Sequence, residues 1–183
     1  MATLPAAPFT PVDDYLRTAY SPDVEYVDGL LIPRGMPAFL HSLLQKILLA
    51  WFDRWEEQYA YTTLPELRTQ IVERSRYRIP GVLLCFTPTR IRTVMNEVPL
   101  AVIEILSPDD TVQQTLARFA DYAALGVPHI LQLDPESHTA HRYQSGSLIQ
   151  TQFTTLPSPK GDIPFDTAAL FAELRARVER ATR

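Results

Sequence analysis

PLAVIEIL, residues 99–106, is the stretch that decides the fold, because it is apolar and largely β-branched except for one carboxylate. This composition predicts a buried β-strand. Side chains alternate between the two faces of a strand, so one face carries Leu100, Val102, Glu104 and Leu106. An ionised carboxylate in such surroundings loses its hydration unless a cation, a metal or several hydrogen-bond donors replace it. Glu104 is therefore the first candidate for a functional residue.

The residues that follow predict a crossover to a parallel strand. Ser107 is the expected N-cap of a helix over residues 108–125, with Pro108 at its first position and Asp110 closing a capping box. Gly126 ends this helix, and a second apolar strand spans residues 130–133. Strand, helix and strand form a parallel crossover unit. Glu104 then lies near the carboxyl end of its strand, where open α/β sheets place their sites.

The rest of the chain adds helices and antiparallel hairpins to this unit. Before it, the pattern predicts a helix over 10–20, a hairpin over 24–32 that turns at Asp28-Gly29, a long helix over 37–57, and strands over 67–72 and 77–86. After it, the pattern predicts strands over 140–144 and 147–153 and a last helix over 167–180, capped by Asp166. We expect an α/β fold with a mixed central sheet flanked by helices, built as one domain over residues 9–183. Residues 1–8 form a loose proline- and alanine-rich segment.

Composition excludes several classes of protein. Hydrophobic residues make up 46% and charged residues 21% of the 183 residues, which is ordinary for a globular domain. No apolar run is long enough to span a bilayer, and the N-terminus lacks the pattern of a signal peptide. Cys85 is the single cysteine, so no intrachain disulfide forms. These features predict a cytoplasmic protein without a membrane partner.

Positive charge is concentrated in one segment, although the formal net charge is −4. Residues 68–92 carry six arginines against the single acid Glu73: Arg68, Arg74, Arg76, Arg78, Arg90 and Arg92. Such a cluster is typical of proteins that track phosphates, and Arg68, Arg76 and Arg78 are the candidate phosphate-binding residues. A strand face with solvated arginines accounts for the same pattern equally well.

An ordered series of short motifs resembles a known family. The motifs are IEILSP at 103–108, Tyr122, GVP at 126–128 and LDP at 133–135, preceded by EYVDG at 25–29, His41, and RIP at 78–80. Together they resemble the Uma-type restriction endonucleases, small bacterial proteins of the PD-(D/E)xK nuclease superfamily, over residues 10–172. The resemblance implies a restriction-endonuclease-like fold and magnesium-dependent hydrolysis of DNA phosphodiesters.

The chain departs from the family pattern at two positions. The family places a metal-binding aspartate after the proline of the earlier strand, and this chain has Gly81 there. The family also has a lysine one helical turn before the tyrosine, and this chain has Arg118. Glycine offers no side-chain oxygen to Mg²⁺, and arginine keeps its proton near neutral pH. The two lysines, Lys46 and Lys160, lie in no matching motif. We therefore expect impaired hydrolysis, with Mg²⁺ as the cofactor of an active protein and no cofactor otherwise.

Glu104 and Arg118 are the predicted site residues, with Glu104 as the remaining metal ligand of the family. Arg118 is expected to pair with Glu104, directly or through one water, in the place of a cation. The neighbours expected around them are Glu25, His41, Asp109, Asp110 and Tyr122. Glu25 also fits a surface acid, His41 a structural histidine and Tyr122 a packing residue.

Two alternatives stay open. In the first, the chain is an active nuclease in which Asp109, Asp110 or Glu25 supplies the missing ligand. In the second, it is a non-catalytic nucleic-acid-binding or dimeric assembly module that reuses the nuclease fold. DNA is the expected partner and a homodimer the expected assembly.

Overall fold

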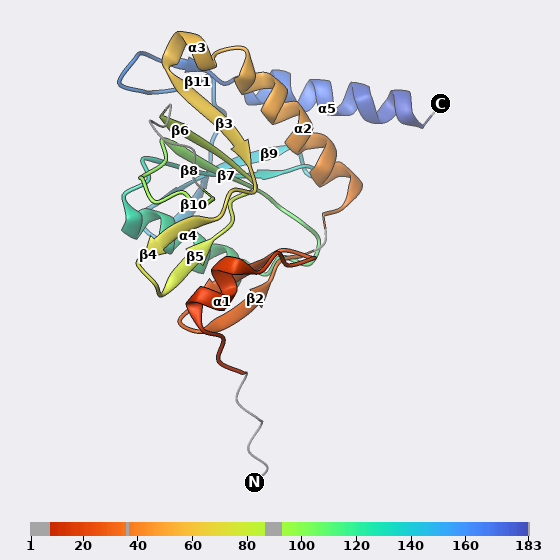
Figure 1. Cartoon of the computed structure of the whole chain (residues 1–183). Coiled ribbons are helices and arrows are strands. Elements are labelled where there is room, and N and C mark those ends of the chain that lie inside the picture. The colour runs from red at the N-terminus through yellow and green to blue at the C-terminus, as the bar shows by residue number, and fades with distance from the viewer. Residues whose placement is uncertain (1–7, 36, 87–92, 183) are drawn as a thin grey trace.

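The computed structural model describes residues 8–35, 37–86 and 93–182 (Figure 1). The helices are α1 (Val12–Arg17), α2 (Phe39–Asp53), α3 (Glu56–Tyr59), α4 (Val112–Leu125) and α5 (Thr167–Ala181). The strands are β1 (Val24–Val27), β2 (Leu30–Pro33), β3 (Tyr61–Pro65), β4 (Thr69–Val72), β5 (Arg76–Arg78), β6 (Val82–Phe86), β7 (Ala101–Ile105), β8 (His129–Asp134), β9 (Thr139–Gln144), β10 (Ser147–Gln150), β11 (Thr155–Leu156) and β12 (Ile163–Pro164). Arg90 and Arg92 lie outside the described residues, as does nearly all of the segment 1–8.

The central sheet has six strands in the order β10-β9-β8-β7-β6-β3. β7 and β8 run parallel, with Glu104 beside Gln132, and the other neighbouring pairs in this sheet are antiparallel. Helix α4 connects the two parallel strands. The predicted mixed sheet and the predicted parallel crossover are therefore confirmed.

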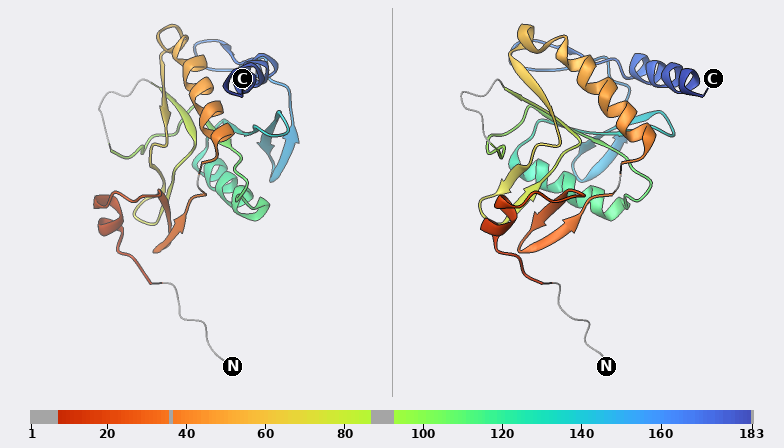
Figure 2. Two further views of the ribbon diagram at one scale, coloured as in Figure 1. Left: turned by 90° about the vertical axis from the view of Figure 1, so that its right-hand side faces the viewer. Right: turned by 45° about the vertical axis from the view of Figure 1, so that its right-hand side comes forward.

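Both faces of the central sheet are covered, as strand β7 shows. Ala101, Ile103 and Ile105 belong to one hydrophobic cluster with residues of α2 and α5. Val102 belongs to a second cluster with Phe119 and Tyr122 of α4. Figures 1 and 2 accordingly place α2 and α5 on one side of the sheet and α4 on the other. Glu104 faces the α4 side, because it alternates with Ile103 and Ile105.

A smaller antiparallel sheet, in the order β2-β1-β5-β4, lies beside α4. Asp28 and Gly29 close the β1–β2 hairpin with φ angles of 51° and 92°, as expected for the predicted turn. A cluster of Tyr15, Tyr26 and Tyr77 joins this sheet to α1. The sheet forms one wall of the site described below.

Several predicted boundaries were wrong. The strand expected over 77–86 is divided between β5 and β6, which belong to different sheets, because Pro80 has no N–H to continue a ladder. The long helix ends at Asp53 and a short helix, α3, follows after Trp55. The last hairpin strand stops at Gln150 rather than 153. Strands β3, β11 and β12 were not predicted.

The start of the crossover helix also differs from the prediction. Helix α4 begins at Val112, and its N-cap is Thr111, whose hydroxyl accepts a hydrogen bond from the Gln114 amide at 3.3 Å. Ser107 instead donates its backbone N–H to Asp110 Oδ2 at 2.9 Å, which closes a turn between β7 and α4. This turn directs the other carboxylate oxygen of Asp110 toward Arg118.

Among the described residues, no helix combines the length and the apolar character that crossing a bilayer requires.

Candidate functional site

Glu104 is the centre of the candidate site and is only 4% exposed. Its Oε1 accepts a hydrogen bond from the Tyr122 hydroxyl at 2.8 Å. Its Oε2 lies 3.4 Å from the Gly81 backbone nitrogen, which donates to it. Two guanidinium groups complete the surroundings, with Arg34 Nη2 at 3.5 Å and Arg118 Nη1 at 3.9 Å from Oε2. Donors and cations from three segments, namely Arg34 after β2, Gly81 before β6 and the α4 residues Arg118 and Tyr122, thus replace the hydration of this carboxylate.

The site brings together residues that are far apart in the sequence. Glu104 comes from the end of β7, and both Arg118 and Tyr122 come from one side of α4. Gly81 precedes β6, which pairs directly with β7. Tyr122 does more than pack, because its hydroxyl holds one oxygen of Glu104. Burial, followed by the nearby Glu104 charge, raises the pKa of Tyr122 well above its ordinary value. Tyr122 therefore stays a neutral donor.

Arg118 makes its main contact with a different carboxylate than expected. Its Nη2 donates to Asp110 Oδ1, whereas the predicted partner, Glu104, is 3.9 Å from Nη1. The 3.9 Å separation is an ion-pair contact, too long for a hydrogen bond. Burial opposes the charge of Arg118, but the carboxylates of Glu104, Glu25 and Asp110 outweigh burial and raise its pKa. Arg118 is therefore a permanent cation shared between Asp110 and Glu104.

Arg34 was missed by the sequence analysis. It follows β2, donates through Nη1 to the Ile79 carbonyl, and directs Nη2 toward Glu104. Its side chain is 13% exposed. In the sequence it is a single arginine in a short connection, without periodicity or motif to distinguish it. Only the folded chain places it against the Ile79 carbonyl and Glu104.

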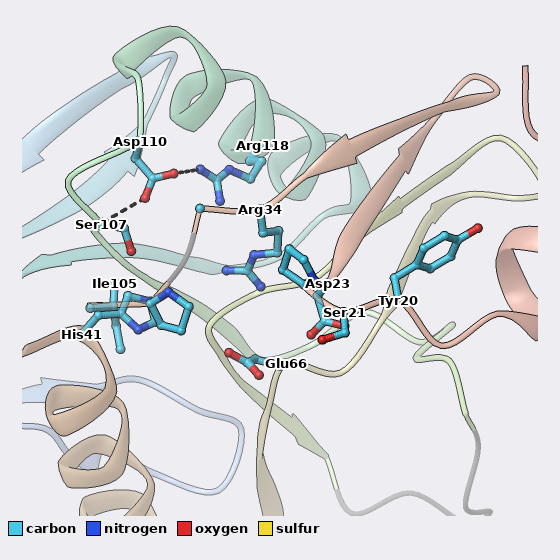
Figure 3. Close-up of a pocket in the computed structure, with 13 residues that line it drawn as sticks. Tyr20, Ser21, Asp23, Arg34, His41, Glu66, Ile105, Ser107, Asp110 and Arg118 are labelled. Carbon is cyan, nitrogen blue, oxygen red and sulfur yellow. Dashed lines mark hydrogen bonds and ion pairs between the residues drawn. The ribbon is translucent and has the colours of Figure 1, made fainter. Parts of the chain in front are cut away.

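Two adjoining cavities open over this centre, with volumes of about 260 Å³ and about 410 Å³. Arg34, Gly35, Asp110 and Arg118 line both of them. The smaller cavity is also lined by His41, and Figure 3 shows Arg34 between Arg118 and Glu66. The larger cavity lies between the β1–β2 hairpin and α4, and further lining residues are Glu25, Arg78 and Asp109. Of the predicted neighbours, His41 lines the smaller cavity, Glu25 and Asp109 line the larger one, and Asp110 lines both, whereas Tyr122 lines neither.

An ion-pair network adjoins the larger cavity, which two of its members, Glu25 and Arg78, line. Arg78 Nη1 donates to Glu25 Oε2 at 2.6 Å, and Arg78 Nε donates to Asp121 Oδ2 at 2.7 Å. Arg76 binds the other oxygen of Asp121 at 2.7 Å. Glu25 also accepts the Ile79 N–H at 3.2 Å. These contacts join the small sheet to α4.

Asp121 is the second site residue that the sequence analysis missed. It is the single acid within α4 and lies one residue before Tyr122. A lone acid on a helix whose one other charged residue is Arg118, opposite an arginine-rich segment, was the signal that could have identified it.

The three candidate phosphate-binding arginines have protein partners. Arg78 is buried, and it and Arg76 bind carboxylates. Arg68 lies outside the cleft, where its guanidinium stacks 4.1 Å from the Tyr15 ring centroid and donates to the Tyr15 carbonyl at 3.3 Å. Within the described residues, these arginines mainly stabilise the small sheet and α1.

The described residues do not fit a divalent metal centre. Among them, no group of three His, Cys, Asp or Glu side chains is placed to hold an ion. Mg²⁺ takes carboxylate and water oxygens in near-octahedral geometry, but Gly81 supplies no side-chain oxygen. Oε2 of Glu104, the oxygen nearest Gly81, faces two guanidinium groups.

His41 lies in the first turn of α2 and is 4% exposed. Burial, assisted by the Arg34 charge, lowers its pKa. His129 at the start of β8 also has a lowered pKa, because it is buried as well. Both imidazoles are therefore favoured in the neutral form by the folded state.

These shifts predict a pH-dependent stability. A lowered pKa means that the unfolded chain binds more protons than the folded chain, so stability is fully present above about pH 6.5 and declines below it. The free energy of unfolding, measured with urea at pH 7.5, 6.5 and 5.5, is expected to fall with pH. The decline is expected to be smaller in His41→Gln and smallest in His41→Gln with His129→Gln. A double variant with the wild-type slope would contradict this assignment.

Comparison with known proteins gives two kinds of match. Residues 12–169 match the family model described as "Uma2: Putative restriction endonuclease". Among solved structures, a putative nuclease belonging to DUF820 from Anabaena variabilis ATCC 29413 aligns with a TM-score of 0.75 at 21% identity, covering 90% of this chain and 99% of that chain. This structure supports the fold. Comparison with curated proteins gave no match.

A second solved structure, the DrdV-DNA complex, aligns at 16% identity with a TM-score of 0.34. The alignment covers 74% of this chain and 13% of the other.

Proposed function

Since this chain belongs to the Uma2 restriction endonuclease family, we propose that it is a restriction-endonuclease-like protein in which magnesium-dependent hydrolysis of DNA is impaired. One observation carries the proposal: Gly81 lies against the remaining acid, with its backbone nitrogen 3.4 Å from Glu104 Oε2. The family's metal-binding aspartate is expected at this position. Without the carboxylate of that aspartate, Glu104 has no second side-chain ligand beside it at position 81.

The residue in the lysine position strengthens the proposal. Lysine can position or activate an attacking water, whereas arginine stays protonated and only stabilises charge. Arg118 is further engaged by Asp110. The two lysines of the chain are no substitutes, because Lys46 is an exposed residue of α2 and Lys160 lies in a loop.

The active-nuclease alternative requires another acid to replace the missing ligand. Asp110 is bound to both Arg118 and the Ser107 amide. Glu25 is bound to Arg78 and the Ile79 amide. Asp109 is exposed and lines the larger cavity, so it is the acid with the fewest competing contacts. We therefore favour impaired hydrolysis and keep Asp109 as the residue on which an active form would depend.

A cleavage assay tests the proposal. Supercoiled and linear DNA incubated with the wild-type protein and Mg²⁺ or Mn²⁺ is expected to remain intact, and Glu104→Gln is expected to behave in the same way. Gly81→Asp restores the missing oxygen ligand and is expected to increase Mn²⁺ affinity, as measured by calorimetry. Robust cleavage by the wild-type protein that Glu104→Gln abolishes would refute the proposal. If Asp109→Asn then also lost the cleavage activity, Asp109 would be identified as the substitute ligand.

The proposed partner is DNA, and the proposed assembly is a homodimer acting in the cytoplasm. If hydrolysis is impaired, such a dimer would serve as a nucleic-acid-binding or assembly module. Filter binding of DNA at several salt concentrations, together with the mass of the assembly in solution, tests these two properties separately from cleavage.

A further inference from the structure

Arg34 joins the two chain segments between which the family's metal would be held. Through Nη1 it donates to the Ile79 carbonyl, two residues before Gly81, and through Nη2 it contacts Glu104 Oε2 at 3.5 Å. An aspartate at position 81 and Glu104 would have to share a cation between these segments. The Arg34 guanidinium already contacts both of them.

The local charges balance without a metal. Arg34 and Arg118 carry two positive charges, and Glu104 and Asp110 carry two negative charges within ion-pair distance of them. Glu104 and Arg34 are 6% and 13% exposed in their side chains, so water screens this pair weakly. A divalent cation approaching Oε2 meets two like charges. Arginine cannot release its proton near neutral pH, so a change in pH does not remove this repulsion.

We infer that Arg34 is the resident counter-cation of Glu104 and that it excludes divalent metal ions independently of the missing aspartate. The inference rests on the proposed function and deepens it, because it assigns the impairment to a second residue. Arg34 is a positioning residue for Glu104. Restoring the aspartate alone then raises the metal affinity above that of the wild-type protein but leaves it weak, since Gly81→Asp would add an acid beside a site still occupied by a guanidinium.

A side chain at position 81 meets one tight backbone contact. A Cβ added to Gly81 would lie 3.2 Å from the Ile103 carbonyl oxygen and 3.6 Å from the Ile105 nitrogen. The first contact requires a shift of a few tenths of an ångström, and the backbone of Gly81 is not in the left-handed region. Gly81→Asp therefore strains the fold at this one backbone contact, and thermal unfolding of the variant measures the cost.

The experiment measures Mn²⁺ affinity by calorimetry, without DNA, in Gly81→Asp and in Gly81→Asp combined with Arg34→Gln. Glutamine keeps an amide donor for the Ile79 carbonyl but removes the charge. The double variant is expected to bind Mn²⁺ at least about 10-fold more tightly than Gly81→Asp alone. Gly81→Asp with Arg34→Lys, which keeps the charge, is expected to bind as weakly as Gly81→Asp.

The matched control is Gly81→Asp combined with Arg74→Gln. Arg74 pairs with Asp13 at the surface, so this variant loses the same charge away from Glu104. Equal Mn²⁺ affinity in Gly81→Asp, the double variant and the control would overturn the inference. An equal gain of Mn²⁺ affinity in the double variant and the control would overturn it as well, because the gain would then be an effect of net charge. Thermal unfolding establishes which variants fold. If Arg34→Gln and Arg34→Met fail to fold while Arg34→Lys folds, Glu104 requires the positive charge of residue 34, which supports the inference.

Failure of the inference and failure of the proposed function give different results. The proposed function fails if the wild-type protein cleaves DNA with Mg²⁺. The inference fails if removing the Arg34 charge leaves Mn²⁺ affinity unchanged in the Gly81→Asp protein.

Discussion

Replacing Arg78 with methionine is expected to lower the free energy of unfolding by roughly 3–5 kcal/mol, one of the two largest effects expected for this protein. Arg78 is 8% exposed and binds both Glu25 and Asp121, whose side chains are 3% and 10% exposed. Methionine fills a similar volume, but it leaves two buried carboxylates without the positive charge and hydrogen-bond donors of Arg78. Arg76 still binds Asp121, so the loss falls mainly on Glu25. Urea denaturation followed by circular dichroism measures the change.

Arg74→Met is the matched control for Arg78→Met. Arg74 pairs with Asp13 in an exposed ion pair, and we expect its removal to change stability little. The triple variant Arg78→Met, Glu25→Gln and Asp121→Asn removes the stranded charges and is expected to recover part of the lost stability. If Arg78→Met costs no more than Arg74→Met, the network does not join the small sheet to α4 as described.

The second large effect is expected at Arg118, where methionine should also lower the free energy of unfolding by roughly 3–5 kcal/mol. Its side chain is 10% exposed and lies between Asp110 and Glu104. The two pairs are expected to contribute unequally. Asp110 is hydrogen-bonded to Arg118, whereas Glu104 is 3.9 Å away and keeps Arg34 and Tyr122 when Arg118 is removed.

Two double-mutant cycles separate these contributions. The cycle of Arg118→Met with Asp110→Asn is expected to give a coupling of about 1–3 kcal/mol, and the cycle with Glu104→Gln a coupling below about 1 kcal/mol. Each is measured by chemical denaturation, with Arg74→Met and Asp13→Asn as a surface control cycle. A stronger coupling to Glu104 than to Asp110 would mean that Arg118 reaches Glu104 directly in solution, as the sequence alone had predicted.

Local patterns in the sequence identified the elements around Glu104. The apolar run of 99–106 indicated β7, the helical stripe and Gly126 indicated α4, and the next apolar run indicated β8. These signals are local, because burial of a strand or of one helix face leaves a short-range periodicity in the chain. The same reasoning was wrong at residues 77–86, where one apolar run serves two sheets and Pro80 marks the division.

The candidate site also combines features that local sequence signals reveal with contacts that they do not. The sequence by itself determined that a carboxylate is buried at the end of β7 and that Gly81 offers no ligand oxygen, because each is a property of residue type and strand pattern; the placement of Arg118 at a lysine position came from the family resemblance. Only the tertiary structure decided that Arg34 contacts Glu104, that Arg118 binds Asp110, and that Arg78 is enclosed by Glu25 and Asp121. Each of these contacts except Arg118–Asp110 joins residues more than 40 positions apart. Ion pairing depends on distance in space and on burial, which leave no periodic trace in the sequence.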